Sequence, residues 1–399
     1  MTLLIDPPNT SGHGRMWSHL ASDTSFDELH RFAATLGIPR RGFDGDHYDI
    51  PAERYDAVVA AGAIPVSSRE LVARLTSTGL RRRKSRLLRP KRPGRSLVRP
   101  ARLRVGDTVA VTAPAGPVPV DRLDAGLAVL RSWGFDVRVE EHTRGRHEIF
   151  GYLAGSDEAR AADFMRAWCD PSVRAVLCAR GGYGVHRMVD LLDWDAIAEA
   201  GPKVLVGFSD VTALHQAFAA RLGMSTVHGP VVTSLGAGDD ASRAHLRALL
   251  LDPAAVLSLT PSRVPSLVPG RVEGVLVGGN VALLAAGLGS ADSVPAAGSI
   301  AVLEDVDEEV YRLDRLLTQL LRAGWFDDVR GVALGQLLGC GSVESLRALV
   351  MDRLAPLGVP MIWDLPVGHG DRNLAFPLGV PAVLDADAGT LQLRQPALV

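Results

Sequence analysis

Residues 203–212 have the sequence KVLVGFSDVT, in which an apolar, β-branched run ends at a short polar turn. The run is typical of a buried strand, and the pattern after it predicts a helix over 211–221. The same order recurs, with strands expected at 108–112, 135–139 and 175–179 and helices at 122–133, 159–168 and 185–192. Such alternation predicts a parallel sheet with crossover helices, which binds ligands at the carboxyl ends of its strands. We therefore expect a site in the loops after Val111, Ala179 and Phe208.

The composition is that of a globular protein of two or three domains, with 399 residues, 47% of them hydrophobic and 22% charged. The three cysteines form no CxxC pair, which argues against a disulfide framework or a thiolate zinc site and favours a reducing compartment. The N-terminus lacks an apolar run of signal-peptide length, and no stretch reaches the roughly 18 apolar residues of a membrane span. These features predict a soluble, cytoplasmic protein.

The formal charge of −2 is an average over unlike parts of the chain. Twelve Lys and Arg residues and no acid lie between Arg81 and Arg104, and the rest of the chain has 31 basic against 45 acidic residues. Interspersed prolines prevent a long helix and like charges extend the chain, so residues 81–103 are expected to form a linker. A solvated tether is the favoured interpretation, and contact with RNA, an anionic lipid or an acidic partner surface is the alternative. The near-neutral charge of the whole chain gives no global reason to expect nucleic acid or a membrane as a partner.

Residues 1–80 are expected to form a small α/β accessory domain, with a strand at 3–5 and helices at 26–36 and 54–61. Histidines and aspartates are concentrated there, namely His13, His19, His30, His47, Asp23, Asp44, Asp46 and Asp49. These side chains can bind a divalent metal, but no HExxH-type spacing places two ligands on one helical face. Scattered surface histidines are the favoured interpretation, and residues 40–48 are expected to be a loop. Through Trp17-Ser18-His19 and Gly45-Asp46-His47-Tyr48 the segment resembles a short bacterial domain of unknown function, which implies no activity.

Two of the expected loops carry unusual residues. Arg180-Gly181-Gly182-Tyr183-Gly184 lacks the spacing of a dinucleotide or phosphate loop, which argues against nucleotide binding. Its glycines allow backbone N–H groups to approach a ligand, as an oxyanion hole requires, or they form a plain turn. Ser209 follows its strand as in a nucleophile elbow, although Val211 replaces the last glycine of GxSxG. A simple helix cap by Ser209 or Asp210 is the alternative.

A serine nucleophile needs a base, usually a histidine that a carboxylate orients. His215 lies on the helix that follows the serine, where it cannot easily turn back. His228 ends a strand and could line the site, and His369 lies between two glycines in a loop. Glu304 is the candidate acid, since it stands where an apolar strand ends, and a solvated strand end is the alternative.

The chain resembles the LD-carboxypeptidases, a serine peptidase family that also contains microcin-immunity enzymes, in six motifs that occur in the same order. The motifs are Arg180-Gly181-Gly182-Tyr183-Gly184, Gly207-Phe208-Ser209-Asp210-Val211-Thr212, His228-Gly229-Pro230, Gly278-Gly279-Asn280, Leu303-Glu304-Asp305-Val306 and Gly368-His369-Gly370. The resemblance covers residues 104–393 and not the first 103. It implies a Rossmann-like α/β domain with the serine at 104–265, a smaller α/β or β-rich domain with the acid and the base at 266–399, and frequent homodimers.

The resemblance also implies site residues and a reaction. Ser209 would be the nucleophile, His369 the base and Glu304 the orienting acid, and the oxyanion hole would use backbone N–H groups of Asp210 and Gly182. Arg180, Tyr183 and His228 are the residues expected to bind substrate. Arg180 stands beside the site and would suit a free carboxylate, and a surface ion pair or a structural role is the alternative. No cofactor and no metal are expected.

The implied reaction is hydrolysis of the amide before a terminal D-amino acid, as in release of D-Ala from murein tetrapeptide during peptidoglycan recycling. One alternative is an immunity enzyme that cleaves a peptidyl- or aminoacyl-nucleotide antibiotic. The other is a catalytically silent sensor of murein fragments that contacts nucleic acid or a partner through its linker and N-terminal domain.

Overall fold

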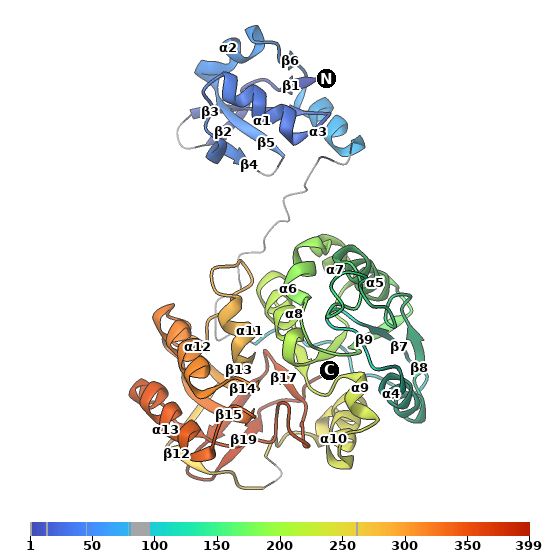
Figure 1. Ribbon diagram of the computed structural model, residues 1–399, viewed down its shortest axis with the longest axis vertical. Coiled ribbons are helices and arrows are strands. Elements are labelled where there is room, and N and C mark those ends of the chain that lie inside the picture. Colours follow the sequence, from blue (N-terminus) through green and yellow to red (C-terminus); the bar gives the residue numbers. More distant parts are fainter. Residues whose placement is uncertain (1, 13–14, 45, 79, 81–95, 261) are drawn as a thin grey trace. The chain divides into compact units, whose positions relative to one another are not determined.

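The structure is a computed structural model that describes residues 1–399 except 1, 13–14, 45, 79, 81–95 and 261. It divides into two compact units, Met1–Arg86 and Leu87–Val399, which are described separately (Figure 1). Most of the expected linker, residues 81–95, lies outside the described residues. No helix in the described part of the chain is long and apolar enough to cross a membrane.

The last part of the expected linker, residues 96–103, belongs to the second unit. The N–H of Leu97 donates to Gly379 O at 2.8 Å, and Val98 forms a β-bridge with Met224. Leu103 is buried in the core of the second unit. The prediction that the linker extends to residue 103 is therefore wrong for these eight residues, because their backbone and apolar side chains are used in packing.

The first unit is a sheet with three helices, in the strand order β4-β5-β3-β1-β6, with β2 paired to β3. Its strands are β1 Leu3–Ile5, β2 Thr10–Gly12, β3 Arg15–Ser22, β4 Phe43–Asp44, β5 His47–Pro51 and β6 Ile64–Pro65. Its helices are α1 Phe26–Thr35, α2 Tyr55–Ala60 and α3 Ser68–Ser77, with 3-10 turns at Arg40–Gly42 and Ala52–Arg54. The prediction of a loop at 40–48 is wrong for the strand residues in this range. Phe43 on β4 pairs with Tyr48 on β5, and Tyr48 is buried in the core.

The second unit begins with a sheet in the order β17-β11-β10-β9-β7-β8. All of its strands are parallel except β17, which runs antiparallel to β11. The strands are β7 Thr108–Thr112, β8 Asp136–Val139, β9 Val173–Cys178, β10 Val204–Gly207, β11 Thr226–His228 and β17 Phe376–Leu378. The helices are α4 Val120–Ser132, α5 Asp157–Cys169, α6 Val185–Met188, α7 Trp194–Ala200, α8 Thr212–Ala217, α9 Val232–Leu235 and α10 Asp240–Leu251.

Alternate strand residues place helices on both faces of this sheet (Figure 1). Val109 and Val111 pack with α4, α9 and α10, whereas Ala110 packs with α5 to α8. Two of the expected helices are interrupted: α6 continues as a 3-10 turn at Val189–Leu191, and α8 continues as a π-helical turn at Phe218–Leu222.

The second sheet has the order β12-β16-β15-β14-β13-β18-β19. Its strands are β12 Ser266–Val268, β13 Arg271–Asn280, β14 Ser299–Val306, β15 Gly331–Leu338, β16 Met361–Ile362, β18 Pro381–Asp385 and β19 Thr390–Leu393. The four central strands β13 to β16 are parallel. Helices α11 Val281–Ala286, α12 Val310–Arg322 and α13 Val343–Leu354 pack on one face, and 3-10 turns lie at Pro253–Ala255 and Ala355–Leu357. The expected α/β class, with a nucleophile-bearing parallel sheet and a second α/β part, is confirmed.

The two sheets meet beside the strand β10 and the helix that follows it. Thr212, the first residue of α8, accepts a hydrogen bond from the N–H of Asn280 at 3.1 Å, at the carboxyl end of β13. Asn280 is paired in register with Glu304 on β14. The Gly-Gly-Asn motif therefore joins the second sheet to the turn that carries Ser209.

Candidate active site

Ser209 lies on the sharp turn between β10 and α8, in a left-handed backbone conformation with φ of 62°. This conformation is uncommon for a residue with a Cβ and is strained by about 1–2 kcal/mol. The turn Ser209–Val211 is 3-10 helical, and its side chains Asp210 and Val211 are buried while Ser209 is partly exposed. A strained serine that reaches solvent at the end of a parallel strand has the geometry of a nucleophile elbow.

The glycine loop after β9 lies directly against this serine. A Cβ placed on Gly181 would lie 2.9 Å from Cβ and 3.2 Å from Oγ of Ser209. Any larger residue would displace the serine, so the loop can approach it only as glycine. The next residue, Gly182, has φ of 114°, which glycine adopts readily.

The carboxylate of Asp210 holds the end of the glycine loop in place. It is 1% exposed and accepts a hydrogen bond from the N–H of Val185 at 2.8 Å. Burial raises the pKa of Asp210 to about 6, against the hydrogen bonds and the nearby Arg160 charge, which lower it. Arg160 is buried as well and donates to Gly184 O at 2.9 Å and to Pro114 O. Neither side-chain role is visible in the sequence, because the partners of Asp210 and Arg160 are backbone groups more than 20 residues away.

The buried Glu304, at the carboxyl end of β14, forms a pair with the partly buried His369. Nδ1 of His369 is 2.7 Å from Oε2 of Glu304, whose side chain is 1% exposed. Burial alone raises the pKa of Glu304, but the attraction of the neighbouring imidazoles outweighs it and lowers the pKa. Burial alone lowers the pKa of His369, and the Glu304 hydrogen bond and charge reverse this and raise it. Glu304 accepts from Nδ1–H, so the other ring nitrogen, Nε2, is available as a base.

The loop that carries His369 is fixed on both sides of the histidine. The N–H of Gly368 donates to Oδ1 of Asn373 at 3.1 Å, and the N–H of Gly370 donates to Oε1 of Gln336 at 2.9 Å. Gly368 has φ of 117°, and a Cβ there would lie 2.9 Å from Oε2 of Glu304. The glycines that flank His369 thus allow the loop to approach the carboxylate closely.

His228 and His215 lie in the interior next to this pair. His228 is 0% exposed, stacks on Phe376 with ring centroids 4.6 Å apart, and has Nε2 3.8 Å from Oε1 of Glu304. The ring has no accessible surface and does not line the pocket described below, so the expectation that it binds substrate gains no support from its position. Nε2 of His215 is hydrogen-bonded to Gly207 O, and burial lowers the pKa of His215 to about 3, so it is neutral.

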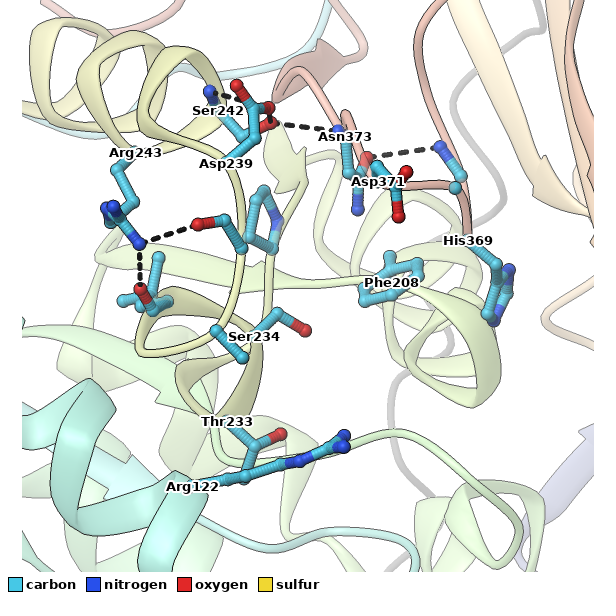
Figure 2. Close-up of a pocket in the computed structure, with 16 residues that line it drawn as sticks. Arg122, Phe208, Thr233, Ser234, Asp239, Ser242, Arg243, His369, Asp371 and Asn373 are labelled. Atoms are coloured by element: carbon cyan, nitrogen blue, oxygen red, sulfur yellow. Dashed lines mark hydrogen bonds between the residues drawn. The ribbon is translucent and has the colours of Figure 1, made fainter.

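A pocket of about 490 Å³ opens beside Phe208 and His369, whose ring centroids are 4.8 Å apart (Figure 2). It is lined mainly by α9, the start of α10 and the His369 loop, with Thr233, Ser234, Asp239, Arg243, Asp371 and Asn373 among the polar residues. Two further substrate-binding candidates, Arg180 and Tyr183, are exposed but do not line this pocket. Arg180 donates to Pro117 O at 2.6 Å, and Tyr183 makes an edge-to-face contact with Tyr152.

Two arginines that are not among the candidates from the sequence, Arg122 and Arg243, line the pocket. Arg122, near the start of α4, is exposed and lines the pocket (Figure 2). Among the described residues it has no ion-pair partner, whereas Arg243 pairs with Asp240 and also donates to Gly238 O. Arg122 occupies an ordinary position in an amphipathic helix, so no sequence signal distinguishes it from a solvated surface residue.

Comparison with known proteins agrees with this architecture. The model of the LD-carboxypeptidase N-terminal domain matches residues 109–229, and that of the LD-carboxypeptidase C-terminal domain matches residues 273–384. Residues 3–78 match a family described as a protein of unknown function, DUF4031, which agrees with the resemblance of the first unit.

Two curated relatives match over nearly their whole length. A putative carboxypeptidase of Streptomyces coelicolor is 58% identical over 76% of this chain and 98% of its own. A murein tetrapeptide carboxypeptidase of Pseudomonas aeruginosa is 38% identical, with 70% and 93% covered. The structure of a muramoyltetrapeptide carboxypeptidase from Oxalobacter formigenes is 29% identical, has a TM-score of 0.63, and covers 72% of this chain and 97% of that one. On these matches the chain belongs to the LD-carboxypeptidase family, whose two domains it joins to an N-terminal domain of unknown function.

Proposed function

We propose that the protein is a serine carboxypeptidase that removes the terminal D-amino acid from a murein tetrapeptide. The observation that carries the proposal is the strained Ser209 on its elbow, together with the Glu304–His369 hydrogen bond of 2.7 Å at the same end of the unit. The identity of 38% to a murein tetrapeptide carboxypeptidase supports this substrate class. The three free cysteines are consistent with work in the cytoplasm.

In the proposed acylation step, Oγ of Ser209 attacks the carbonyl carbon of the scissile amide while Nε2 of His369 takes the hydroxyl proton. The carbonyl oxygen becomes an anion, which backbone N–H groups of Gly182 and Asp210 stabilise. The C–N bond then breaks, and His369 gives its proton to the leaving amine. The products of this step are the free D-amino acid and an acyl ester on Ser209.

In the second step, a water molecule attacks the ester carbonyl while His369 accepts one of its protons. Collapse of the anion breaks the bond to Oγ, the proton returns to Ser209, and the shortened peptide leaves with a new carboxylate. Glu304 keeps Nδ1 of His369 protonated and stabilises the imidazolium in both steps. The close contact of Gly181 with Ser209 supports the assignment of the anion site to this loop.

A carboxypeptidase must also recognise the free carboxylate of its substrate. Arg180 and Tyr183 in the glycine loop are the candidates that the family resemblance suggests, and Arg122 in the pocket is a third. Bidentate contact with a guanidinium is a strong and selective way to bind a carboxylate.

We expect the protein to form a homodimer, which light scattering of the purified chain can measure.

The test is incubation of the purified full-length chain with murein tetrapeptide and mass spectrometry of the products. The expected result is loss of one D-Ala by the wild-type protein and no loss by Ser209→Ala, with both proteins folded by circular dichroism. Near wild-type turnover by Ser209→Ala would contradict the assignment of the nucleophile. Absence of turnover by the wild-type protein would favour the silent sensor.

An immunity-type hydrolase is the second candidate, because the microcin C7 self-immunity protein of Escherichia coli is 26% identical over 96% of its length. Such an enzyme would use the same nucleophile, base and acid, so the residues discussed above do not separate the two. An aminoacyl-sulfamoyl adenosine, tested in parallel with the tetrapeptide at equal concentration, separates them. We expect faster turnover of the tetrapeptide, in line with the higher identity of 38% to the murein enzyme.

A further inference from the structure

Two neighbouring strands of the first unit bring imidazole and carboxylate groups together. His19 on β3 is directly opposite Asp49 on β5 in the antiparallel register, and His47 is two residues before Asp49. Residues two apart on a strand point to the same face, and opposite residues of a pair share a face as well. The register alone therefore places the three side chains side by side.

The ligand atoms of these three residues converge on one point. Nε2 of His47 is 3.2 Å from Oδ1 of Asp49, and Nε2 of His19 is 4.0 Å from the same oxygen. One ligand atom from each residue lies within 4.8 Å of the other two, and the rings of His19 and His47 are 4.9 Å apart. Within the part of the chain that the structure describes, no other three His, Cys, Asp or Glu residues have ligand atoms that all lie within 4.8 Å of one another.

Each imidazole is oriented by its own carboxylate, which contacts the ring nitrogen that faces away from Asp49. Nδ1 of His19 is 3.0 Å from Oδ2 of Asp6, and Nδ1 of His47 is 2.5 Å from Oδ1 of Asp46. Asp6 and Asp46 are both buried, and Asp6 is itself fixed by the Ser68 hydroxyl at 2.6 Å. A carboxylate that binds Nδ1–H fixes the tautomer in which Nε2 carries the lone pair. Both rings therefore present a basic nitrogen toward Asp49.

We propose that the first unit binds a divalent transition-metal ion of the zinc class through Nε2 of His19, Nε2 of His47 and the carboxylate of Asp49. Two imidazoles and one carboxylate suit such an ion better than Mg²⁺ or Ca²⁺, which prefer oxygen ligands alone. Ligands at about 2.0–2.2 Å from a tetrahedral ion are about 3.4 Å apart. The His47–Asp49 distance already matches this value, and His19 needs only a small movement.

The site has the composition of an open rather than a closed metal centre. Three protein ligands leave a fourth tetrahedral position for water or another small ligand. The Asp49 side chain is 45% exposed, so this position is accessible from solvent. The sequence pattern favours scattered surface histidines because it has no ligand spacing typical of a helix, whereas strand pairing brings these three residues together.

The test uses the untagged full-length chain, stripped with EDTA and dialysed, and then titrated with Zn²⁺ by calorimetry and with Co²⁺ by visible absorption. We expect one equivalent of each ion to bind, with the absorption of tetrahedral Co²⁺ and a rise in Tm on addition of Zn²⁺. His47→Gln and Asp49→Asn should lose this equivalent and the rise in Tm. Asp46→Asn, which only removes the orienting carboxylate, should weaken binding by about 10- to 100-fold.

His147→Gln is the matched control, because it removes a partly exposed imidazole from the other unit. It should bind one equivalent with wild-type affinity. Asp49→Asn changes a half-exposed side chain by one atom, so its fold can be verified by circular dichroism. The proposal is wrong if the wild-type chain binds neither ion at 100-fold excess, or if folded His47→Gln and Asp49→Asn both bind like the wild type.

Discussion

Oε1 of Glu304 faces Nε2 of His228 at 3.8 Å, on the side of the carboxylate that His369 does not occupy. Both side chains are buried, and the distance is too long for a hydrogen bond, so the contact is electrostatic. Glu304 is therefore enclosed between two imidazoles, of which only His369 reaches the pocket. The arrangement holds Glu304 ionised in a place where burial would favour its neutral form.

Replacement of His228 should destabilise the ionised form of Glu304, the proposed orienting acid. The effect is indirect, because the buried His228 ring does not reach the pocket. In His228→Leu the buried Oε1 of Glu304 loses the imidazole that faces it, which costs on the order of 1–3 kcal/mol of unfolding free energy. Because the folded pKa of Glu304 is lowered, its contribution to stability is present above its usual pKa of 4.5 and is lost as the pH falls.

The stability deficit of His228→Leu should accordingly be larger at neutral than at acidic pH in chemical denaturation. His228→Gln, which keeps an N–H donor, is the matched control and should recover part of the stability. We also expect kcat to fall and KM to stay unchanged in His228→Leu. A changed KM with full stability would instead indicate that the ring contacts substrate.

Glu304→Gln should change the pH dependence of activity in a defined direction. The carboxylate raises the pKa of His369, so the wild-type base is protonated, and kcat/KM falls, as the pH drops below this raised pKa. Without the charge, burial dominates and the pKa of His369 decreases, so the acidic limb should move to lower pH. The maximal kcat should fall by about 10²- to 10⁴-fold because the ring loses its orientation. A pH profile with an unmoved acidic limb would show that another group is the base.

The strain at Ser209 predicts different effects of two inactive variants on stability. Ser209→Gly removes the Cβ from a left-handed backbone conformation and should raise the free energy of unfolding by about 1 kcal/mol. Ser209→Ala keeps the Cβ and should leave the stability near that of the wild type. Denaturant titration of the two variants under identical conditions measures the difference. Equal stabilities would mean that the turn relaxes and stores no strain.

The sequence predicted the architecture of the second unit well because its strands and helices differ in hydrophobic period. The buried run at 203–208 and the turn after it correspond to β10 and its elbow. The sequence did not predict that residues 96–103 pack on this unit. Leu97, Val98 and Leu103 are few apolar residues within a strongly basic stretch, so they show no strand or helix period.

Site residues could be predicted from the sequence only where they belong to a motif of a few consecutive residues. Ser209 and His369 stand in glycine-rich turns that are visible in the sequence. The buried role of His228 and the fixing of the glycine loop by Asp210 arise from contacts between segments far apart in the chain. Arg122 could not be selected because its place in the pocket depends on how α4 packs beside α9.

Arg122 and Arg180 are the two candidates proposed to bind the substrate carboxylate, and their different environments predict different outcomes. Arg122 lines the pocket that contains His369 and has no ion-pair partner among the described residues, so its full charge is available. Arg180 already donates to Pro117 O and does not line the pocket. We expect Arg122→Met to raise KM for the tetrapeptide by about 10- to 100-fold with little change in kcat, which corresponds to a charge-assisted hydrogen bond of 1.5–3 kcal/mol.

A tetrapeptide with an amidated C-terminus separates carboxylate recognition from other effects of the substitution. It lacks the charge, so the wild type and Arg122→Met should turn it over with similar KM if the guanidinium binds the carboxylate. Arg180→Met serves as the matched variant, and its main effect should be on kcat, because release of Pro117 loosens the loop beside Ser209. If KM instead rises in Arg180→Met and not in Arg122→Met, the carboxylate is bound at the glycine loop, and the leaving amino acid lies on the opposite side of the serine from this pocket.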